Sequence, residues 1–216
     1  MGTRDQNRQR IQQCGVIAIV RTKSSGQLLE IAEAIRAGGI DVIEFTMTTP
    51  NALQTISQVA EKSGDEVLLG AGTVLDPETA RAAILAGARF LVSPSLNLRV
   101  IEMCNRYSVI AIPGAFTPTE IVTAWEAGAD FVKIFPATPV GPGYIKDLLA
   151  PLPQLKLVPT GGVSLENTGD YIRAGAAAVA VGSNLVGKKL VDEKRFDQLQ
   201  ETAQKYVAAV RGARSA

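Results

Sequence analysis

Residues 121–136 read IVTAWEAGADFVKIFP, a stretch that runs from a helical segment through Ala-Gly into an apolar strand. The same order returns in residues 31–46, 80–94 and 171–183. A glycine directly after a helix suits the left-handed cap that ends many helices. The strand then begins within a few residues, as loops from helix to strand allow. The chain is therefore built from a repeated helix–strand unit.

The repeat returns at intervals of about 40–50 residues, which is too long for one strand–helix unit but fits two. Four further apolar segments fill the intervals, at residues 15–21, 66–73, 108–114 and 155–162. Strands that alternate with helices predict a parallel sheet. Eight such units predict a (β/α)8 TIM barrel, with residues 1–216 as a single domain.

Two more helices are expected outside the repeat. A polar helix over residues 3–13 precedes the first strand, and a last helix covers about residues 192–211. The alternative fold is a doubly wound open sheet. It is less well supported, because no dinucleotide-binding glycine fingerprint follows the first strand.

The composition argues against several function classes. The 22 basic and 21 acidic residues leave a net charge of +1, which gives no electrostatic reason to expect nucleic acid. No apolar run approaches the ~20 residues of a membrane span, and the polar start lacks the apolar core of a secretory signal. Two isolated cysteines favour a cytoplasmic setting. With no histidine in the chain, we expect no catalytic triad, no metal and no cofactor.

Two charged residues stand in strands that are otherwise apolar: Glu44 in DVIEFT and Lys133 in DFVKIF. They belong to the second and sixth strands, and one layer of a barrel interior takes its side chains from alternate strands. Glu44 and Lys133 can therefore face each other across the mouth, where their pKa values would shift. The simpler alternatives are that Lys133 reaches water from a strand end and that Glu44 is a rim carboxylate paired with Arg21.

The carboxyl ends of the strands, where such barrels carry their active sites, are rich in polar residues and glycines. Gly161 and Gly162 follow the seventh strand, and Gly182 and Ser183 follow the eighth. Glycines let backbone N–H groups approach an anion, so these loops predict a phosphate site. The alternative is that the glycines serve tight turns alone. Other strand ends carry Arg21, Thr73, Pro94 and Thr160.

These motifs together resemble a known family. They are IAIVR, AGGIDVIEFT, GAGTV, FLVSP, IPG, AGADFVKIFPA, GPGYIKDL, VPTGGV and VGSNLV, which span about residues 15–186. The chain resembles the 2-keto-3-deoxy-6-phosphogluconate aldolases, which overlap with the 4-hydroxy-2-oxoglutarate aldolases. The resemblance implies a (β/α)8 barrel, and members of the family are commonly homotrimers.

The resemblance also implies roles for individual residues. Lys133 would form a Schiff base, Glu44 would act as the acid–base residue, and Thr73 would hold the carboxylate of pyruvate. Thr48 stands where some members carry a carboxylate-binding arginine, which leaves Arg21 as the nearby arginine. Further contacts to substrate or to its phosphate are expected from Pro94, Phe135, Thr160, Gly161, Gly162, Gly182 and Ser183.

The implied reaction is the reversible cleavage of 2-keto-3-deoxy-6-phosphogluconate into pyruvate and glyceraldehyde 3-phosphate, and also of 4-hydroxy-2-oxoglutarate into pyruvate and glyoxylate. A lysine iminium supports this chemistry without histidine. The amine must be neutral to attack; burial would lower its pKa, whereas Glu44 would raise it. The alternatives are an aldolase for the galactonate epimer and a non-catalytic barrel that binds phosphosugars.

Overall fold

The computed structural model describes residues 2–22 and 26–215. Its strands are β1 (Val16–Val20), β2 (Val42–Thr46), β3 (Leu68–Gly72), β4 (Phe90–Val92), β5 (Ile110–Ile112), β6 (Gly114–Ala115), β7 (Val132–Ile134), β8 (Leu157–Pro159) and β9 (Val179–Val181). Its helices are α1 (Arg4–Cys14), α2 (Leu28–Ala37), α3 (Ala52–Ser63), α4 (Pro77–Leu85), α5 (Leu98–Arg106), α6 (Pro118–Glu126), α7 (Gly141–Leu149), α8 (Leu165–Arg173), α9 (Lys188–Asp192) and α10 (Phe196–Arg214).

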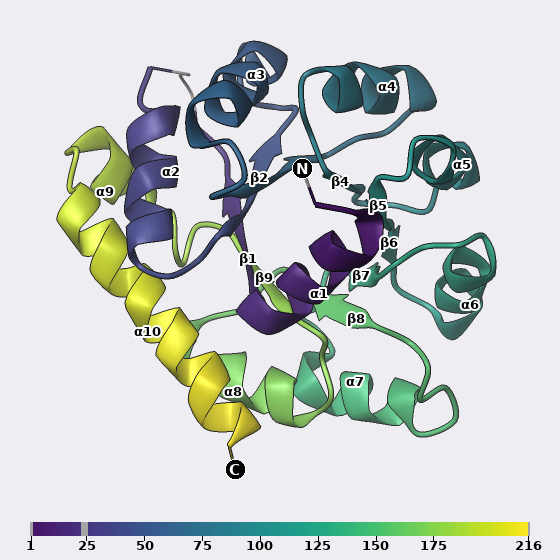
Figure 1. Ribbon diagram of the computed structural model, residues 1–216. Coiled ribbons are helices and arrows are strands. Elements are labelled where there is room, and N and C mark those ends of the chain that lie inside the picture. Colours follow the sequence, from purple (N-terminus) through teal and green to yellow (C-terminus); the bar gives the residue numbers. More distant parts are fainter. Residues whose placement is uncertain (1, 23–25, 216) are drawn as a thin grey trace.

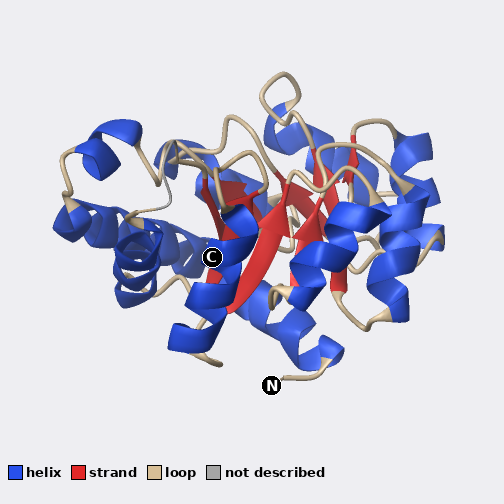
Figure 2. Ribbon diagram, turned by 90° about the horizontal axis from the view of Figure 1, so that it is seen from above, coloured by secondary structure: helices blue, strands red, loops and turns tan. Residues whose placement is uncertain are grey.

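The strands lie at the centre of the molecule, with helices around them (Figures 1 and 2). A six-stranded sheet has the order β5-β4-β3-β2-β1-β9, a three-stranded sheet has the order β6-β7-β8, and every pair is parallel. Thr160 bridges to Ala180 between the two sheets. At their other junction the Lys133 amide donates to the Pro113 carbonyl over 2.9 Å. The predicted α/β fold with parallel strands is confirmed, and its sheet is curled.

Two predicted elements differ from the observed ones. The strand expected over residues 108–114 is divided into β5 and β6, because Pro113 has no N–H to give to a ladder. The last helix, expected to begin near residue 192, begins at Phe196 after the short α9. Lys194 separates the two helices with a left-handed backbone (φ 55°) that a continuous helix cannot contain.

Side chains alternate between two apolar clusters, one inside the curl of strands and one between strands and helices. Ile43 and Phe45 belong to the helix-facing cluster, whereas Val42 belongs to the interior cluster. Ile11 of α1 joins the interior cluster from the amino end, where α1 lies across the strands (Figure 1). The interior cluster consists of Ile11, Ile17, Ile19, Val42, Leu68, Phe90, Val92, Ile110, Ile112, Phe131, Val158, Ala178 and Ala180.

Within the described residues, no helix is both long and apolar enough to cross a membrane. The helices carry local signals that explain where they begin. Thr3 caps α1 and Thr117 caps α6, each in a reciprocal capping box with the third residue of its helix. Asp76 caps α4, with its carboxylate 2.6 Å from the Thr79 amide.

A buried carboxylate fastens α1 to the amino end of the strands. Asp130, which is 5% exposed, accepts hydrogen bonds from Arg4 Nη2 at 2.7 Å and from the Ala111 amide at 2.9 Å. Arg4 also donates to the Asn105 side chain at 2.7 Å. The network therefore joins α1, α5 and β5 around one side chain.

We expect Asp130→Ala to lower the free energy of unfolding by about 2–4 kcal/mol, because it leaves the Ala111 amide without its acceptor and the Arg4 guanidinium without its carboxylate partner. Urea unfolding measures this loss. The matched control is Asp170→Ala, which removes an exposed ion pair with Arg173 and should cost less than about 1 kcal/mol. Equal losses in the two variants would contradict a structural role for this network.

Candidate active site

Glu44 and Lys133 both lie on the interior face of the strands. Glu44 follows Val42 by two residues in β2, and Lys133 follows Phe131 by two residues at β7, so each side chain points the same way as a member of the interior cluster. Glu44 is 2% exposed and Lys133 is 7% exposed. Lys133 therefore does not reach freely into water, and Glu44 is not an exposed rim carboxylate.

Burial opposes the charged form of both members of this pair. Burial lowers the pKa of Lys133 below its ordinary value; Arg21 lowers it further, and Glu44 opposes both effects. Burial raises the pKa of Glu44, against the opposing charges of Lys133 and Arg21. Glu44 Oε2 is fully buried and has no hydrogen-bond partner among the described residues. The site thus holds an unpartnered carboxyl group and an amine biased toward its nucleophilic form.

The apolar residues next to Lys133 in the sequence lie on different sides of the strand. Phe131 is fully buried in the interior cluster below the lysine, whereas Ile134 packs on the helix-facing side. The Phe135 ring lies with its centroid 4.7 Å from Lys133 Nζ and is 37% exposed. Phe135 therefore contacts the lysine and remains partly open at the rim, where a substrate contact was expected of it.

Thr73 directly follows β3 and has a left-handed backbone, with φ 60°. A β-branched residue in this region is strained by roughly 1–3 kcal/mol, and such strain gathers at functional sites. The half-buried Thr73 is therefore held by the surrounding structure in a conformation that the free chain would avoid. No pattern in the sequence indicated this strain.

The loops after β8 and β9 lie side by side. The Asn184 side chain donates to the Val163 carbonyl at 2.7 Å and so joins them, a contact that the sequence analysis did not predict. The amides of Gly162 and Ser183 have no acceptor within the described part of the chain, whereas the Gly161 amide lies on the side of the strand that bridges to Ala180. Unpaired N–H groups on two neighbouring loops suit an anion.

Glycine occurs at the positions in these loops for different structural reasons. Gly161 and Gly162 have φ values of 89° and 73°, so their turn conformations already require glycine. Gly182 has no such φ, and a Cβ on it would meet the Ile19 Cβ at 3.9 Å and no other atom closer. The turn explanation therefore covers Gly161 and Gly162 but not Gly182, which keeps a space open instead.

The remaining predicted residues lie at the same ends of the strands. Arg21 is exposed beyond β1, and Pro94 is half-buried beyond β4. Thr160 is 4% exposed, and its hydroxyl donates to the Val158 carbonyl at 3.3 Å. Thr48 is exposed, with its hydroxyl 3.0 Å from that of Thr46.

Thr46 was missed by the sequence analysis, although the alternation of β2 could have found it. It follows Glu44 by two residues and therefore lies on the same face of the strand, fully buried. Its hydroxyl also lies 3.4 Å from the hydroxyl of Thr49. Beyond the buried acid, β2 thus ends in a small group of threonine hydroxyls.

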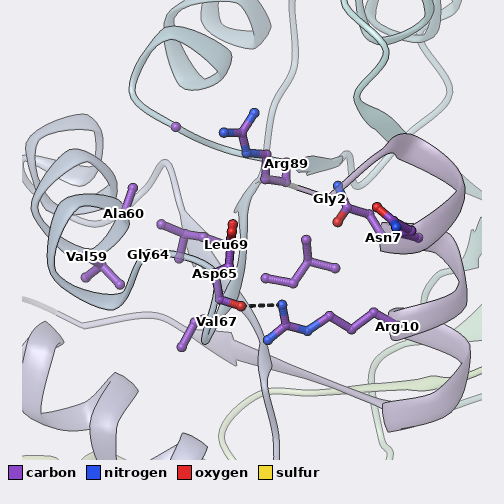
Figure 3. A pocket seen from close by; sticks show the side chains of 13 residues that line it. Gly2, Asn7, Arg10, Val59, Ala60, Gly64, Asp65, Val67, Leu69 and Arg89 are labelled. Atoms are coloured by element: carbon purple, nitrogen blue, oxygen red, sulfur yellow. Dashed lines mark hydrogen bonds between the residues drawn. The ribbon is translucent and has the colours of Figure 1, made fainter.

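A cavity of about 480 Å³ lies elsewhere, between α1, α3 and the amino end of β3 (Figure 3). Arg10, on its wall, already donates to the Asp41 carboxylate and to the Asp65 carbonyl, both at 2.7 Å. None of the predicted site residues lines this cavity. The candidate active site therefore lies at the carboxyl ends of the strands and not in this cavity. The described residues contain no group of three or more cysteine, aspartate or glutamate side chains that could hold a metal.

Similarity to known proteins identifies the family of this chain. The family model described as KDPG and KHG aldolase matches residues 8–202. The chain belongs to this family of aldolases. It is therefore a lyase that acts on carbon–carbon bonds, as the sequence motifs predicted.

Members of the family with different named substrates are about equally similar to this aldolase. The 2-dehydro-3-deoxy-6-phosphogalactonate aldolase of Escherichia coli (strain K12) is 36% identical over 93% of this chain and 95% of its own. The 2-dehydro-3-deoxy-phosphogluconate aldolase of Treponema pallidum (strain Nichols) is also 36% identical, over 90% of this chain and 93% of its own. Overall identity therefore does not choose between the two substrates.

Solved structures of the family superpose closely on this aldolase. A structure described as native KDPGal has a TM-score of 0.86 at 35% identity and covers 93% of this chain and 96% of its own. The KDPG aldolase of Legionella pneumophila, described as holding pyruvate captured as a covalent carbinolamine intermediate, has a TM-score of 0.86 at 29% identity and covers 92% of this chain and 96% of its own.

Proposed function

We propose that this aldolase is a class I enzyme in which Lys133 forms an imine with the 2-keto group of its substrate. The observation that carries the proposal is the pairing of a buried amine, whose pKa is lowered, with the buried and unpartnered carboxyl group of Glu44. A neutral amine is the nucleophile that a carbonyl requires. A non-catalytic phosphosugar-binding barrel would have no use for this costly pair.

The proposed reaction begins when Lys133 Nζ attacks the C2 carbonyl carbon and the resulting carbinolamine loses water to give an iminium. Glu44, directly or through a water molecule, then takes the proton of the C4 hydroxyl while the C3–C4 bond breaks. The electron pair of that bond moves to the iminium nitrogen, which leaves an enamine and releases the aldehyde. Protonation at C3 and hydrolysis return pyruvate and the free lysine.

The other residues of the site would bind and orient the substrate. Thr73, fixed beside the mouth, would hold the carboxylate of pyruvate, and the exposed Arg21 would compensate for the absence of an arginine at Thr48. The open edge of the Phe135 ring would cover the substrate chain. Pro94 and Thr160 would form further parts of the wall.

The substrate we propose is 2-keto-3-deoxy-6-phosphogluconate, with 4-hydroxy-2-oxoglutarate as a second one. The loops that contain Gly161, Gly162, Gly182 and Ser183 would receive the phosphate group, with the amides of Gly162 and Ser183 as donors and the space at Gly182 left open for it. The second candidate is the 6-phosphogalactonate epimer, favoured by the similarity to the Escherichia coli enzyme named for it. The two differ at C4, where the shape of the pocket decides.

The proposal extends to the whole molecule. The bridge from Thr160 to Ala180 and the bond from Lys133 to Pro113 support a closed (β/α)8 barrel, with residues 1–216 as a single domain. We also propose a cytoplasmic homotrimer that needs no metal and no cofactor, and whose partners are small phosphorylated acids and pyruvate rather than nucleic acid or membrane.

Gly182→Ala should lower kcat/KM for the phosphorylated substrate by about 10–100-fold, because the new methyl group would enter the space proposed for the phosphate. Its rate on 4-hydroxy-2-oxoglutarate, which has no phosphate, should change little. The measurement is pyruvate release from each substrate and from both C4 epimers.

The control for Gly182→Ala is Gly212→Ala in α10, where a Cβ meets no atom within 4 Å. Both rates should stay at the wild-type level in this control. Two or more hydrogen bonds to a charged phosphate, at ~1.5–3 kcal/mol each, predict that the wild-type enzyme loses about two to four orders of magnitude without the phosphate. Equal rates on phosphorylated and unphosphorylated keto-deoxy acids would contradict the phosphate site and favour the hydroxy-oxoglutarate reaction.

A further inference from the structure

The interior face of β3 carries two glycines where its neighbours carry larger side chains. Leu68, Gly70 and Gly72 form this face of the strand, and β3 pairs with β2 so that Gly72 lies opposite Thr46 and Gly70 lies opposite Glu44. At Gly70 the ring of Phe90 fills the space that a side chain would take. At Gly72 the side chain of Glu44 fills that space.

The side chain of Glu44 leans directly over Gly72. A Cβ at position 72 would overlap Glu44 Oε1 and Cδ, and would stand 2.7 Å from Glu44 Cγ. Real Cβ atoms do not approach other atoms so closely. Glu44 can therefore keep its observed position while residue 72 is glycine, and no other residue type leaves the same slot.

The backbone at Gly72 gives no separate reason for glycine. Gly72 has no left-handed φ; it sits in a regular ladder, and its carbonyl accepts the Met47 amide at 2.8 Å. Any residue could adopt this conformation. What position 72 requires is the missing side chain, and the group that uses the missing volume is the carboxyl group of Glu44.

No hydrogen bond holds Glu44 Oε2 among the described residues, so packing against Gly72 helps to set the position of this carboxyl group beside the charges of Lys133 and Arg21. We propose that Gly72 is a positioning residue, whose empty side-chain volume holds the Glu44 carboxyl group in place for proton transfer. The inference rests on the proposed role of Glu44 as the acid–base group. A misplacement of about 1 Å at such a group can cost ~10²-fold in rate.

The test begins with Gly72→Ala. The atoms it displaces form the flexible end of a side chain, so the variant should fold while Glu44 moves aside. We expect exchange of the pyruvate methyl protons in heavy water, which needs the acid–base group, to slow about 100-fold or more. Borohydride trapping of pyruvate on Lys133, which needs the amine, should persist. A purely structural defect would lower the exchange rate and the trapping yield together.

A double-mutant cycle separates the loss of space for the Glu44 side chain from a general loss of stability. In a Glu44→Ala background the methyl group introduced by Gly72→Ala has room, so this second substitution should add no further loss of exchange and no further drop in melting temperature. The matched control is Gly70→Ala, which meets Phe90 instead of Glu44. It should lower the melting temperature equally in both backgrounds and should not separate exchange from trapping.

Exchange within threefold of the wild-type rate in Gly72→Ala would overturn the inference. So would a drop in melting temperature from Gly72→Ala that is as large in the Glu44→Ala background as in the wild type. If Gly72→Ala does not fold, folding of the double variant Gly72→Ala with Glu44→Ala supports the slot and its failure overturns it. Absence of trapping in the wild-type enzyme would instead contradict the proposed function. The melting temperatures of the cycle would still decide whether Gly72 makes room for Glu44.

Discussion

Lys133→Arg is expected to reduce aldol cleavage by about four orders of magnitude or more, the scale seen when a covalent nucleophile is removed. Arginine keeps a cation and much of the length, but its guanidinium stays protonated and cannot attack a carbonyl. Pyruvate release in a coupled assay measures the loss. The matched control is Lys205→Arg on the exposed side of α10, which should keep the wild-type rate. Substantial cleavage by Lys133→Arg would show that another group forms the bond.

The pH dependence follows from the same lysine. Burial holds the pKa of Lys133 below its ordinary value, so a neutral amine persists to lower pH than for an exposed lysine. Imine formation should fall as the pH drops through this lowered pKa, because the ammonium form is not a nucleophile. A profile with the midpoint of an ordinary exposed lysine would contradict the burial argument.

Glu44→Gln is expected to slow cleavage and pyruvate proton exchange by roughly 10²–10⁴-fold, the usual contribution of a general acid–base group. Glutamine keeps the shape of the side chain but cannot take up a proton. Since Glu44 raises the pKa of Lys133, its neutral replacement should lower that pKa further and leave pyruvate trapping possible at lower pH. The variant should thus separate proton transfer from imine formation.

Exchange of pyruvate methyl protons in heavy water, measured beside borohydride trapping of the same sample, reports the two steps. The exposed Glu61→Gln in α3 is the control for a lost carboxylate away from the site. Exchange at the wild-type rate in Glu44→Gln would show that Glu44 is not the acid–base group. Tyr144 would then be the next candidate, although its hydroxyl already donates to the Phe116 carbonyl.

The features of the fold and the site that the sequence could predict are those with a local cause. Glycines after helices and β-branched strands after glycines revealed the alternation, which led to parallel strands. The alternate-strand rule, applied to Glu44 and Lys133, led to two charged groups on one interior face. Both residues do lie buried there.

What the sequence could not predict depends on contacts between distant segments. Gly72 looks like part of a glycine-rich turn until Glu44, from another strand, is found to fill its missing side chain. The strained backbone of Thr73 and the bond from Asn184 to Val163 arise from loops brought together by the fold. Phe135 reads as one more buried strand residue, yet it ends at the rim because β7 has already ended.

The most direct test of the central claim is chemical trapping of the imine. The wild-type enzyme is incubated with pyruvate, reduced with borohydride and digested, and the peptides are weighed by mass spectrometry. We expect the reduced pyruvate adduct on the peptide that contains Lys133, and none in Lys133→Arg. An adduct on another lysine, or equal labelling of Lys133→Arg, would contradict the account.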